Sequence, residues 1–330
     1  MTAARRAAPA AAEHGGEAAP GPPTKASRAA RRLVGELARR HFGQQEARIV
    51  ARGGGLSNDV FEVRVAEGDF IVRTHEKPTK FNDYLKERWA MEAARTAGVP
   101  TPRVLEIGNA ADGRPYMISE KVQGVDGRMA PRRLELIEAL GRAAAQLHKV
   151  RTRGFGPVFD WSANTLSRQE SWPHWLAEGF EVERRLGVLL KHRVIDARQA
   201  GRLRRRAAEM ARWRKRPVLH HGDLRPKNAI VDGDSGRLLA VLDWENCVSA
   251  PAPFWDLSLA LHDLGIDEKE AFLAGYGMKP RAAAAAMPYV RLFNVLNYAH
   301  AVESAARKRR PDRMERFRLR LAGGLDLYDP

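Results

Sequence analysis

The sequence predicts an α+β fold, with a small antiparallel sheet in the first part of the chain and mostly helices in the second. Before residue 120, short apolar runs alternate with polar residues and are separated by glycine-containing turns, a pattern typical of half-buried strands. After residue 130, apolar residues recur mainly at helical spacing. A chain of 330 residues, 44% of them hydrophobic, is long enough for one large or two medium domains.

The chain is expected to begin with a tail and a helix. Residues 1–26 are rich in alanine, proline and glycine and hold few large apolar side chains, so we expect them to be disordered. Residues 27–43 carry Leu33 and Leu37 at helical spacing, with arginine and glutamate between them. This segment predicts a helix that covers the first domain.

A glycine-rich connection precedes the first predicted hairpin. Phe61, Val63 and Val65 alternate with polar residues, and a turn then leads to a second strand over 70–73. The connection begins with three glycines at 53–55, and glycine lets backbone N–H groups approach phosphate oxygens because no Cβ blocks them. A plain flexible hairpin explains the same glycines and is favoured when this stretch is taken by itself.

Several further elements follow along the chain. Residues 84–92 predict a helix that ends at Gly98, shortly before a Pro-Thr-Pro segment. Apolar spacing also predicts strands over 104–107 and 116–118, an amphipathic helix over 132–149 and helices over 257–325. Residues 158–216 are less decisive, and their large aromatic side chains are expected in the core or along a substrate cleft: Trp161, Trp172, Trp175 and Phe180.

The stretch from His220 to Glu245 brings oxygen-bearing side chains together without any long-range contact. Two short apolar runs flank an Asp-Gly-Asp-Ser-Gly turn, so an antiparallel hairpin places Asn228 and Asp243 at its open end. Two neighbouring oxygen ligands suit a hard cation such as Mg²⁺, and Asp223, on the loop before the hairpin, is then free to act as a base. Ordinary polar turn residues explain the hairpin geometry equally well.

The motif His221-Gly222-Asp223, followed after four residues by Asn228 and later by Asp243-Trp244-Glu245, resembles the catalytic and metal-binding motifs of the aminoglycoside phosphotransferase-like kinases (the APH and choline kinase type). The resemblance covers roughly residues 45–275. It implies a bilobal protein-kinase-like fold, with an N-terminal nucleotide-binding lobe over 27–122 and a C-terminal catalytic and substrate lobe over 123–330.

The resemblance also implies roles for the residues that match the motifs. Asp223 would accept or orient the proton of an acceptor hydroxyl, while Asn228 and Asp243 would hold Mg²⁺ at the phosphates of ATP. Arg73 stands where a kinase strand carries its phosphate-contacting lysine. Its expected partner is Glu87 on the following helix, with Glu92 as the main competitor.

Nucleotide contacts are expected from two further segments. The glycine-rich loop would cover the phosphates through Gly54, Gly55, Ser57 and Asn58, and the hinge between the lobes would bind adenine through the backbone from Glu120 to Val122. Asp256, in the segment after the metal motif, is expected to support the catalytic loop from below. His148 is expected to be structural.

The function implied is ATP-dependent transfer of the γ-phosphoryl group to a hydroxyl of a small molecule, either an antibiotic or a metabolite. Residues 245–330 show no surplus of acidic over basic residues, which argues weakly against a polycationic aminoglycoside acceptor. Two alternatives remain: a catalytically silent kinase-like nucleotide-binding protein, and a basic nucleic-acid-binding protein. The first would lose motif residues that are present here.

The chain is strongly basic, with a net charge of +16 and a pI near 10.4. Clusters such as 202–206, 212–216 and 307–310 lie in predicted helices, and charge runs of this kind usually form solvated helix faces. No zinc-finger spacing or RNA-binding aromatic motif occurs, so no specific nucleic-acid partner is expected.

Cysteine usage and hydropathy bear on the compartment. The single cysteine, Cys247, excludes an intrachain disulfide and fits a reducing environment. No apolar run is long enough to span a bilayer, and the N-terminus lacks the apolar core of a signal peptide. We therefore expect a cytoplasmic protein, with no prediction of its oligomeric state.

Overall fold

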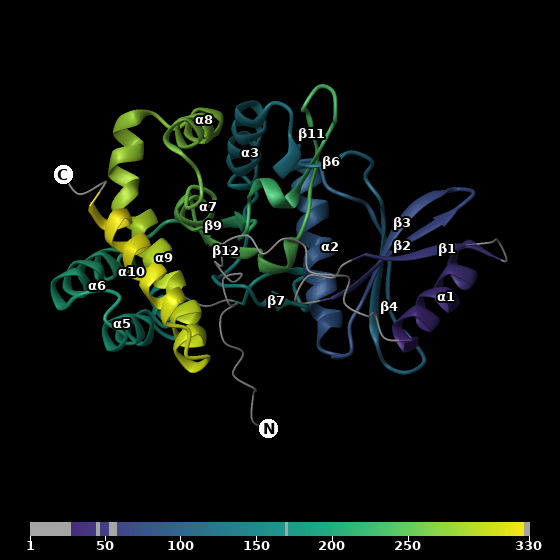
Figure 1. Cartoon of the computed structure of the whole chain (residues 1–330), viewed down its shortest axis with the longest axis horizontal. Coiled ribbons are helices and arrows are strands. Elements are labelled where there is room, and N and C mark those ends of the chain that lie inside the picture. The colour runs from purple at the N-terminus through teal and green to yellow at the C-terminus, as the bar shows by residue number, and fades with distance from the viewer. Residues whose placement is uncertain (1–27, 44–46, 53–57, 169–170, 327–330) are drawn as a thin grey trace.

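The computed structural model describes residues 28–43, 47–52, 58–168 and 171–326, which form two lobes (Figure 1). An antiparallel sheet with one helix lies at the right of that view, and the helical lobe lies at the left. This arrangement confirms the predicted α+β order, with the sheet built from the first part of the chain. The glycine-rich loop at 53–57, and with it Gly54, Gly55 and Ser57, lies outside the described residues.

The N-terminal lobe is a five-stranded antiparallel sheet, in the order β1-β2-β3-β5-β4, with the helix α1 against one face. Its apolar face packs Phe61, Val63 and Val72 against Leu33 and Leu37 of α1, which gives this lobe a small core of its own. The alternation seen in the sequence therefore places apolar side chains on the helix-covered face, as expected. The elements are α1 (Arg28–Phe42), β1 (Arg48–Arg52), β2 (Asp59–Val65), β3 (Gly68–Thr74), β4 (Val104–Asn109) and β5 (Pro115–Glu120).

Helix α2 (Lys80–Thr96) lies between the sheet and the helical lobe. Its buried residues Tyr84, Ala90 and Met91 belong to the large core that fills the C-terminal lobe, not to the small core under α1. The helix ends where predicted, because Gly98 adopts a left-handed conformation with φ of +87°.

The C-terminal lobe contains the remaining helices and several short strands. Its helical segments are η1 (Gly127–Met129), α3 (Arg133–Leu147), α4 (Trp172–His174), η2 (Trp175–Gly179), α5 (Val182–Lys191), α6 (Ala197–Ala211), η3 (Pro226–Asn228), η4 (Trp244–Asn246), α7 (Phe254–Ala260), α8 (Ile266–Tyr276), α9 (Pro280–Arg307) and α10 (Pro311–Asp326). Its strands are β6 (Val125–Asp126), β7 (Phe159–Asp160), β8 (Thr165–Leu166), β9 (Pro217–His220), β10 (Ala229–Val231), β11 (Leu238–Val241) and β12 (Val248–Pro251).

The segment at 158–216, which the sequence left undecided, is mostly helical. Trp172, Trp175 and Phe180 are buried and stack in series, with ring centroids 5.2 Å and 5.6 Å apart. They belong to the large core, as expected of aromatic side chains. Trp161 differs, because it is half exposed and lies parallel to Phe81 of α2.

Two short antiparallel sheets position the predicted motifs. Strands β9 and β12 pair with His220 opposite Val248, and β10 and β11 form the predicted hairpin with Ala229 opposite Val241. The loop that carries Asp223 connects these two sheets.

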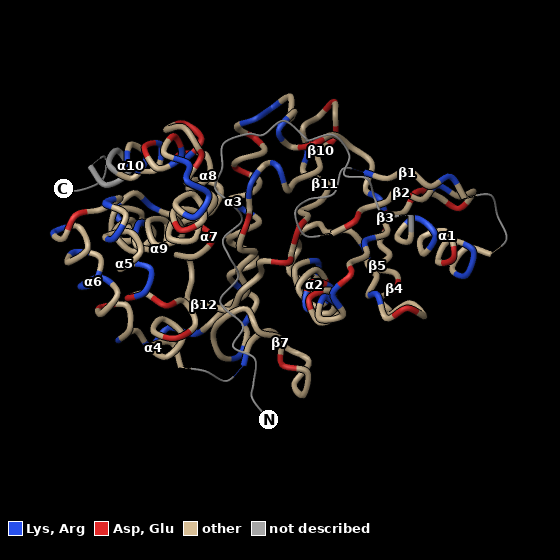
Figure 2. The backbone as a smooth tube through the Cα atoms, turned by 60° about the horizontal axis from the view of Figure 1, so that its bottom comes forward, with Lys and Arg blue, Asp and Glu red and all other residues tan. Residues whose placement is uncertain are grey.

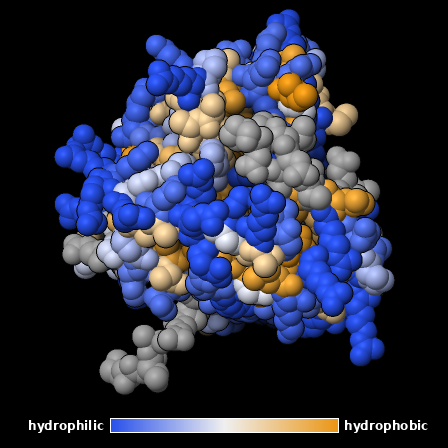
Figure 3. All heavy atoms as spheres, turned by 90° about the vertical axis from the view of Figure 1, so that its left-hand side faces the viewer, coloured by the Kyte–Doolittle hydropathy of each residue, from blue (hydrophilic) through white to orange (hydrophobic). Residues whose placement is uncertain are grey.

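The outer surface of the C-terminal lobe is mostly hydrophilic, with only small apolar patches (Figure 3). Among the helices that the structure describes, none combines the length and the apolar character needed to cross a membrane.

Candidate active site

The loop after β9 is held in one conformation by its own histidine and glycine. The His221 ring accepts a hydrogen bond from the Asp223 N–H through Nδ1 (3.1 Å) and donates through Nε2 to the Leu242 carbonyl (2.9 Å). Burial lowers the pKa of His221, which suits this neutral tautomer. Gly222 has a φ of +81°, and a Cβ there would lie 2.0 Å from the Asn246 carbonyl oxygen, so only glycine fits.

Asp256, at the start of α7, supports this loop from below, as expected. Its carboxylate accepts hydrogen bonds from the backbone N–H groups of His221 (3.0 Å) and Gly222 (2.7 Å) and from His148 Nε2 (3.2 Å). Burial alone would raise the pKa of Asp256, but His148 and His220 outweigh it and hold the pKa well below its usual range. The buried carboxylate therefore stays ionised and fixes the backbone just before Asp223.

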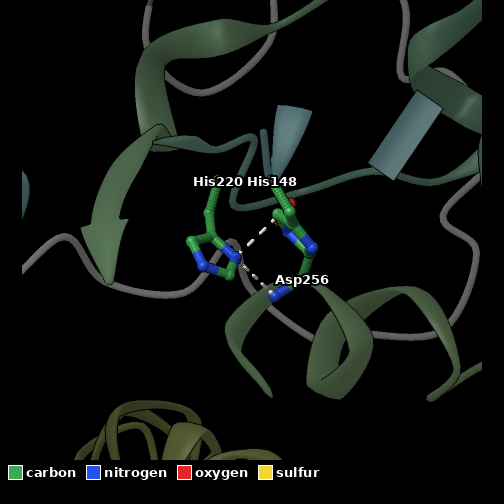
Figure 4. A group of neighbouring side chains, drawn as sticks. All are labelled: His148, His220 and Asp256. Atoms are coloured by element: carbon green, nitrogen blue, oxygen red, sulfur yellow. Dashed lines mark hydrogen bonds and ion pairs between the residues drawn. The ribbon is translucent and has the colours of Figure 1, made fainter. Parts of the chain in front are cut away.

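His148, His220 and Asp256 converge from α3, β9 and α7 at distances that would also suit a metal ion (Figure 4). Each group already has hydrogen-bond partners. His148 Nδ1 lies 2.8 Å from the Tyr276 hydroxyl, and His220 Nδ1 accepts from the Asp256 N–H (3.4 Å). Burial is the main cause that lowers the pKa of His148, to about 4. We interpret the three residues as a structural support of the loop that carries Asp223 and not as a metal centre, consistent with the structural role expected of His148.

Asp223 is 2% exposed and is surrounded by hydrogen-bond donors. Arg225 donates to Oδ1 at short range, while Lys227 Nζ (2.8 Å) and Asn228 Nδ2 (2.9 Å) donate to Oδ2. Burial would raise the pKa of this carboxyl, but the charges and hydrogen bonds of Arg225 and Lys227 outweigh it and lower the pKa. Asp223 is therefore an ionised group with fixed orientation.

Asn228 and Asp243 lie at the open end of the β10–β11 hairpin, as the sequence predicts. The Leu242 N–H donates to the Asn228 carbonyl (2.8 Å), which places Asp243 next to Asn228. The amide Nδ2 of Asn228 donates hydrogen bonds to the carbonyl and the carboxylate of Asp223. Its Oδ1 has no hydrogen bond to any residue in the described ranges. Asp243 adopts a left-handed conformation with φ of +63°.

The carboxylate of Asp243 has no hydrogen bond or ion pair with the residues that the structure describes. Burial is the main cause that raises its pKa, and the nearby charges of Glu245 and Asp223 add to this effect. An ionised carboxylate that is poorly solvated and close to other acidic groups is stabilised by a cation. The Oδ1 of Asn228 is a second oxygen without a hydrogen bond among the described residues, at the same end of the hairpin.

Arg73, on β3, makes a short charged hydrogen bond to Glu87 of α2, which decides between the two candidate partners. Glu92 lies on the solvent side of the same helix. Burial raises the pKa of Glu87 even with Arg73 beside it, and its Oε1 has no hydrogen-bond partner among the described residues. The Arg73 guanidinium also lies 5.4 Å from the centre of the Tyr84 ring.

Of the two other segments expected to contact a nucleotide, the hinge is described in full and the glycine-rich loop only at Asn58. Of the loop residues, Asn58 is visible, and its Oδ1 accepts a hydrogen bond from the Tyr84 hydroxyl (2.9 Å). In the hinge, the N–H groups of Glu120 and Lys121 donate to the carbonyls of Arg103 and Asp69. Within the described ranges the Val122 backbone has no such bond, which makes Val122 the available hinge contact.

Sequence reasoning missed the lysines that hold Glu245, two residues after Asp243. Lys80 Nζ lies 2.8 Å from the Glu245 carboxylate, and Lys86 Nζ donates to the Glu245 carbonyl at 2.6 Å. It also missed Arg225 and Lys227, although both lie inside the motif, two and four residues after Asp223. Elsewhere, lysine and arginine are spread over both lobes among acidic residues (Figure 2).

Comparison with known proteins identifies similar sequences. Residues 48–293 match the model of the phosphotransferase enzyme family. The chain is 24% identical over 207 residues to hygromycin-B 4-O-kinase of Escherichia coli, covering 59% of this chain and 56% of that protein. It is also 24% identical over 211 residues to acyl-CoA dehydrogenase family member 10 of Mus musculus, covering 58% of this chain and 18% of that protein. The chain thus spans little more than half of one relative and under a fifth of the other.

Among solved structures, the chain is similar to a thermostable mutant of aminoglycoside phosphotransferase APH(4)-Ia in a ternary complex with AMP-PNP and hygromycin B. The TM-score is 0.65 at 17% identity, over 88% of this chain and 97% of that one. A likeness at this identity concerns the fold, and it confirms the bilobal protein-kinase-like architecture. The family match confirms the resemblance inferred from the motifs.

Proposed function

Because this chain belongs to the phosphotransferase enzyme family, we propose that it transfers the γ-phosphoryl group of ATP to a hydroxyl of a small molecule. The observation that carries this proposal is the contrast at the open end of the hairpin. Asp223 is ionised and fixed by donors, while Asp243 and the Oδ1 of Asn228 are oxygen ligands without a partner among the described residues. One group suits an alcohol proton and the others suit a cation.

The residues present fit Mg²⁺. Asp243 supplies a carboxylate whose raised pKa reflects burial and acidic neighbours, and Asn228 supplies a neutral amide oxygen. Hard oxygen ligands in small number are typical of Mg²⁺ sites that also take phosphate oxygens. When bound, the ion neutralises charge on the phosphates as the γ-phosphoryl group leaves.

The protein's own groups then act on the acceptor. Asp223 accepts a hydrogen bond from the acceptor hydroxyl and aligns its oxygen with the γ-phosphorus. The new O–P bond forms as the bond from the γ-phosphorus to the β,γ-bridging oxygen breaks. The hydroxyl proton passes to Asp223 and from there to solvent, and ADP leaves. Since the transition state of phosphoryl transfer is loose, positioning supplies most of the acceleration.

The nucleotide would lie between the two lobes, with residues 27–122 on one side and residues 123–330 on the other. Arg73, held by Glu87, is the cation for the inner phosphates, and Val122 is the backbone contact for adenine. Asn58 and the loop residues Gly54, Gly55 and Ser57 remain candidates for the phosphate cover. Tyr84 links two of these parts, because it contacts both Arg73 and Asn58.

The test is the release of ADP from Mg·ATP by the full chain across a panel of hydroxyl acceptors. Asp223→Asn is expected to lower kcat by about 10²–10⁴-fold, the usual contribution of a positioned base, with nucleotide affinity unchanged. Asp234→Asn, in the exposed turn of the same hairpin, is the matched control and should behave as wild type.

Near-normal turnover by a folded Asp223→Asn protein would refute the role of Asp223. If wild type binds ATP but no acceptor stimulates ADP release, the chain is a silent nucleotide-binding protein. Nucleic-acid retention that falls steeply with salt, without ATP turnover, would favour the basic binding protein instead.

A further inference from the structure

The carboxylate of Asp223 is covered in a way that restricts how an acceptor can reach it. With 2% of its surface exposed, it contacts Arg225, Lys227 and Asn228. A hydroxyl group needs hydrogen-bond distance to the carboxylate in order to be oriented. One of the covering side chains must therefore move when the acceptor binds.

Lys227 is the cover that is free to move. Its side chain is 37% exposed, and its ammonium group has only Asp223 as a partner within the described residues. The Arg225 side chain is 12% exposed and is held on its other side by Asp263 (3.3 Å). Asn228 is buried and uses its amide on Asp223. A lysine on a flexible four-carbon stem is also the easiest of these groups to redirect.

The ion pairs around Asp223 contain more cations than carboxylates. Asp263 is exposed, and its carboxylate accepts hydrogen bonds from two arginines. These are Arg225 and, at short range, Arg320 of α10. Three cations, Arg225, Lys227 and Arg320, thus pair with two carboxylates, Asp223 and Asp263. The third carboxylate nearby, Asp243, is the one assigned to Mg²⁺. On the metal side, Glu245 is paired with Lys80.

This arrangement does not suit a polycationic acceptor. An ammonium group on the acceptor would compete for carboxylates that are already paired. At Asp263 it would compete with Arg225 and Arg320, and at Glu245 with Lys80. Breaking these ion pairs to form new ones yields little binding free energy, because the displaced arginine or lysine then faces the ammonium group of the acceptor. An acceptor with a negative group meets the opposite situation, since it adds the charge that the cluster lacks.

We propose that the physiological acceptor is an anionic hydroxyl compound, and that Lys227 leaves Asp223 on acceptor binding to pair with a carboxylate or phosphate group of that compound. This inference rests on the proposed phosphotransferase function. In the resulting complex the acceptor hydroxyl replaces the ammonium group at Asp223. Lys227 is then a specificity-determining residue, whereas Arg225 stays in place and keeps Asp223 oriented.

The experiment compares acceptors of matched skeleton and different charge. The probes are glycerate, glycerol 3-phosphate and 3-hydroxybutyrate as anions, their neutral counterparts glycerol and 3-hydroxybutyramide, and the cations 3-amino-1-propanol and kanamycin. ADP release by the full chain with Mg·ATP gives kcat/KM for each. We expect kcat/KM for the anions to exceed that for their neutral counterparts by about tenfold or more, the size of one hydrogen bond between charged groups, and the cations to be the poorest.

Variants of Lys227 separate acceptor recognition from phosphate contact. Lys227→Met is expected to lower the ratio of kcat/KM for each anion to kcat/KM for its neutral counterpart about tenfold, while Lys227→Arg keeps this ratio. Lys279→Met, at an exposed site before α9, is the matched control. Glycerate against glycerol 3-phosphate tells whether the recognised group is a carboxylate or a phosphate.

The outcomes are distinct. Equal losses on anions and neutral acceptors in Lys227→Met would place Lys227 at the transferred phosphoryl group and overturn the proposal. Preference of wild type for neutral or cationic acceptors would overturn it as well. Failure of every acceptor, with ATP binding intact, would count against the phosphotransferase function itself and not against the charge preference.

Discussion

Two fully buried carboxylates, one in each lobe, are held in opposite ways. Asp256 in the C-terminal lobe accepts hydrogen bonds from the backbone of the catalytic loop and from the buried His148. Glu62 on β2 is held by side chains only: Lys121 (2.9 Å), Arg64 (2.5 Å) and Arg52 (2.8 Å). Burial opposes ionisation of Glu62, but these three cations outweigh it and lower its pKa to about 2.

The difference concerns rigidity. Backbone donors have no rotamer freedom to lose, whereas long side chains that are 52% and 45% exposed, as in Arg52 and Arg64, are ordered only at an entropic cost and are screened by salt. The loop that carries Asp223 is therefore held firmly. The exposed arginines around Glu62 are held less firmly. Glu62 lies on the same sheet face as Arg73, because Arg73 pairs with Val60, two residues before Glu62.

The largest expected effect comes from removing the rigid support. Asp256→Ala leaves two buried N–H groups without an acceptor and should lower the free energy of unfolding by about 3–5 kcal/mol. Urea unfolding measures it, with Asp267→Ala on the exposed face of α8 as control. A loss below about 1 kcal/mol would mean that the catalytic loop does not depend on Asp256.

The Arg73–Glu87 pair should lie between the two extremes. Arg73→Met leaves Glu87 buried without its cation, but the raised pKa of Glu87 means that protonation relieves part of the penalty. We expect a loss of about 2–3 kcal/mol in urea unfolding, together with weaker ATP binding. Glu92→Gln, on the solvent side of α2, should change neither quantity. If Glu92→Gln weakened ATP binding and Arg73→Met did not, the expected role of the Arg73–Glu87 pair in ATP binding would be wrong.

The smallest effect is expected at Glu62. Glu62→Gln should cost about 1 kcal/mol at low salt and less at high salt, whereas the loss in Asp256→Ala should not depend on salt. Because the folded pKa of Glu62 is lowered, its contribution is complete above its usual unfolded pKa of about 4.3 and is lost as the pH falls towards 2. Urea unfolding at several salt concentrations and between neutral and acidic pH measures both trends. A salt-independent cost would show that the Glu62 cluster is as rigid as the catalytic loop.

The sequence allowed most of the candidate site to be predicted, because its parts are close along the chain. Asp223 and Asn228 lie in one motif, and a hairpin of defined register brings Asp243 to the same end. The support by Asp256 was expected from resemblance, and the hydrogen bonds now give it a physical basis. The glycine-rich loop residues and the ATP contacts stay predictions.

The local framework follows from the sequence: apolar periodicity sets the strands and helices, and the spacing of the motif fixes its geometry. Which charged side chains meet depends on the tertiary structure. Glu87 and not Glu92 reaches Arg73, Asp263 holds Arg225, and Lys80 holds Glu245. The physical reason is that long charged side chains pair according to the relative placement of whole elements, which depends on packing across the large core and not on local sequence.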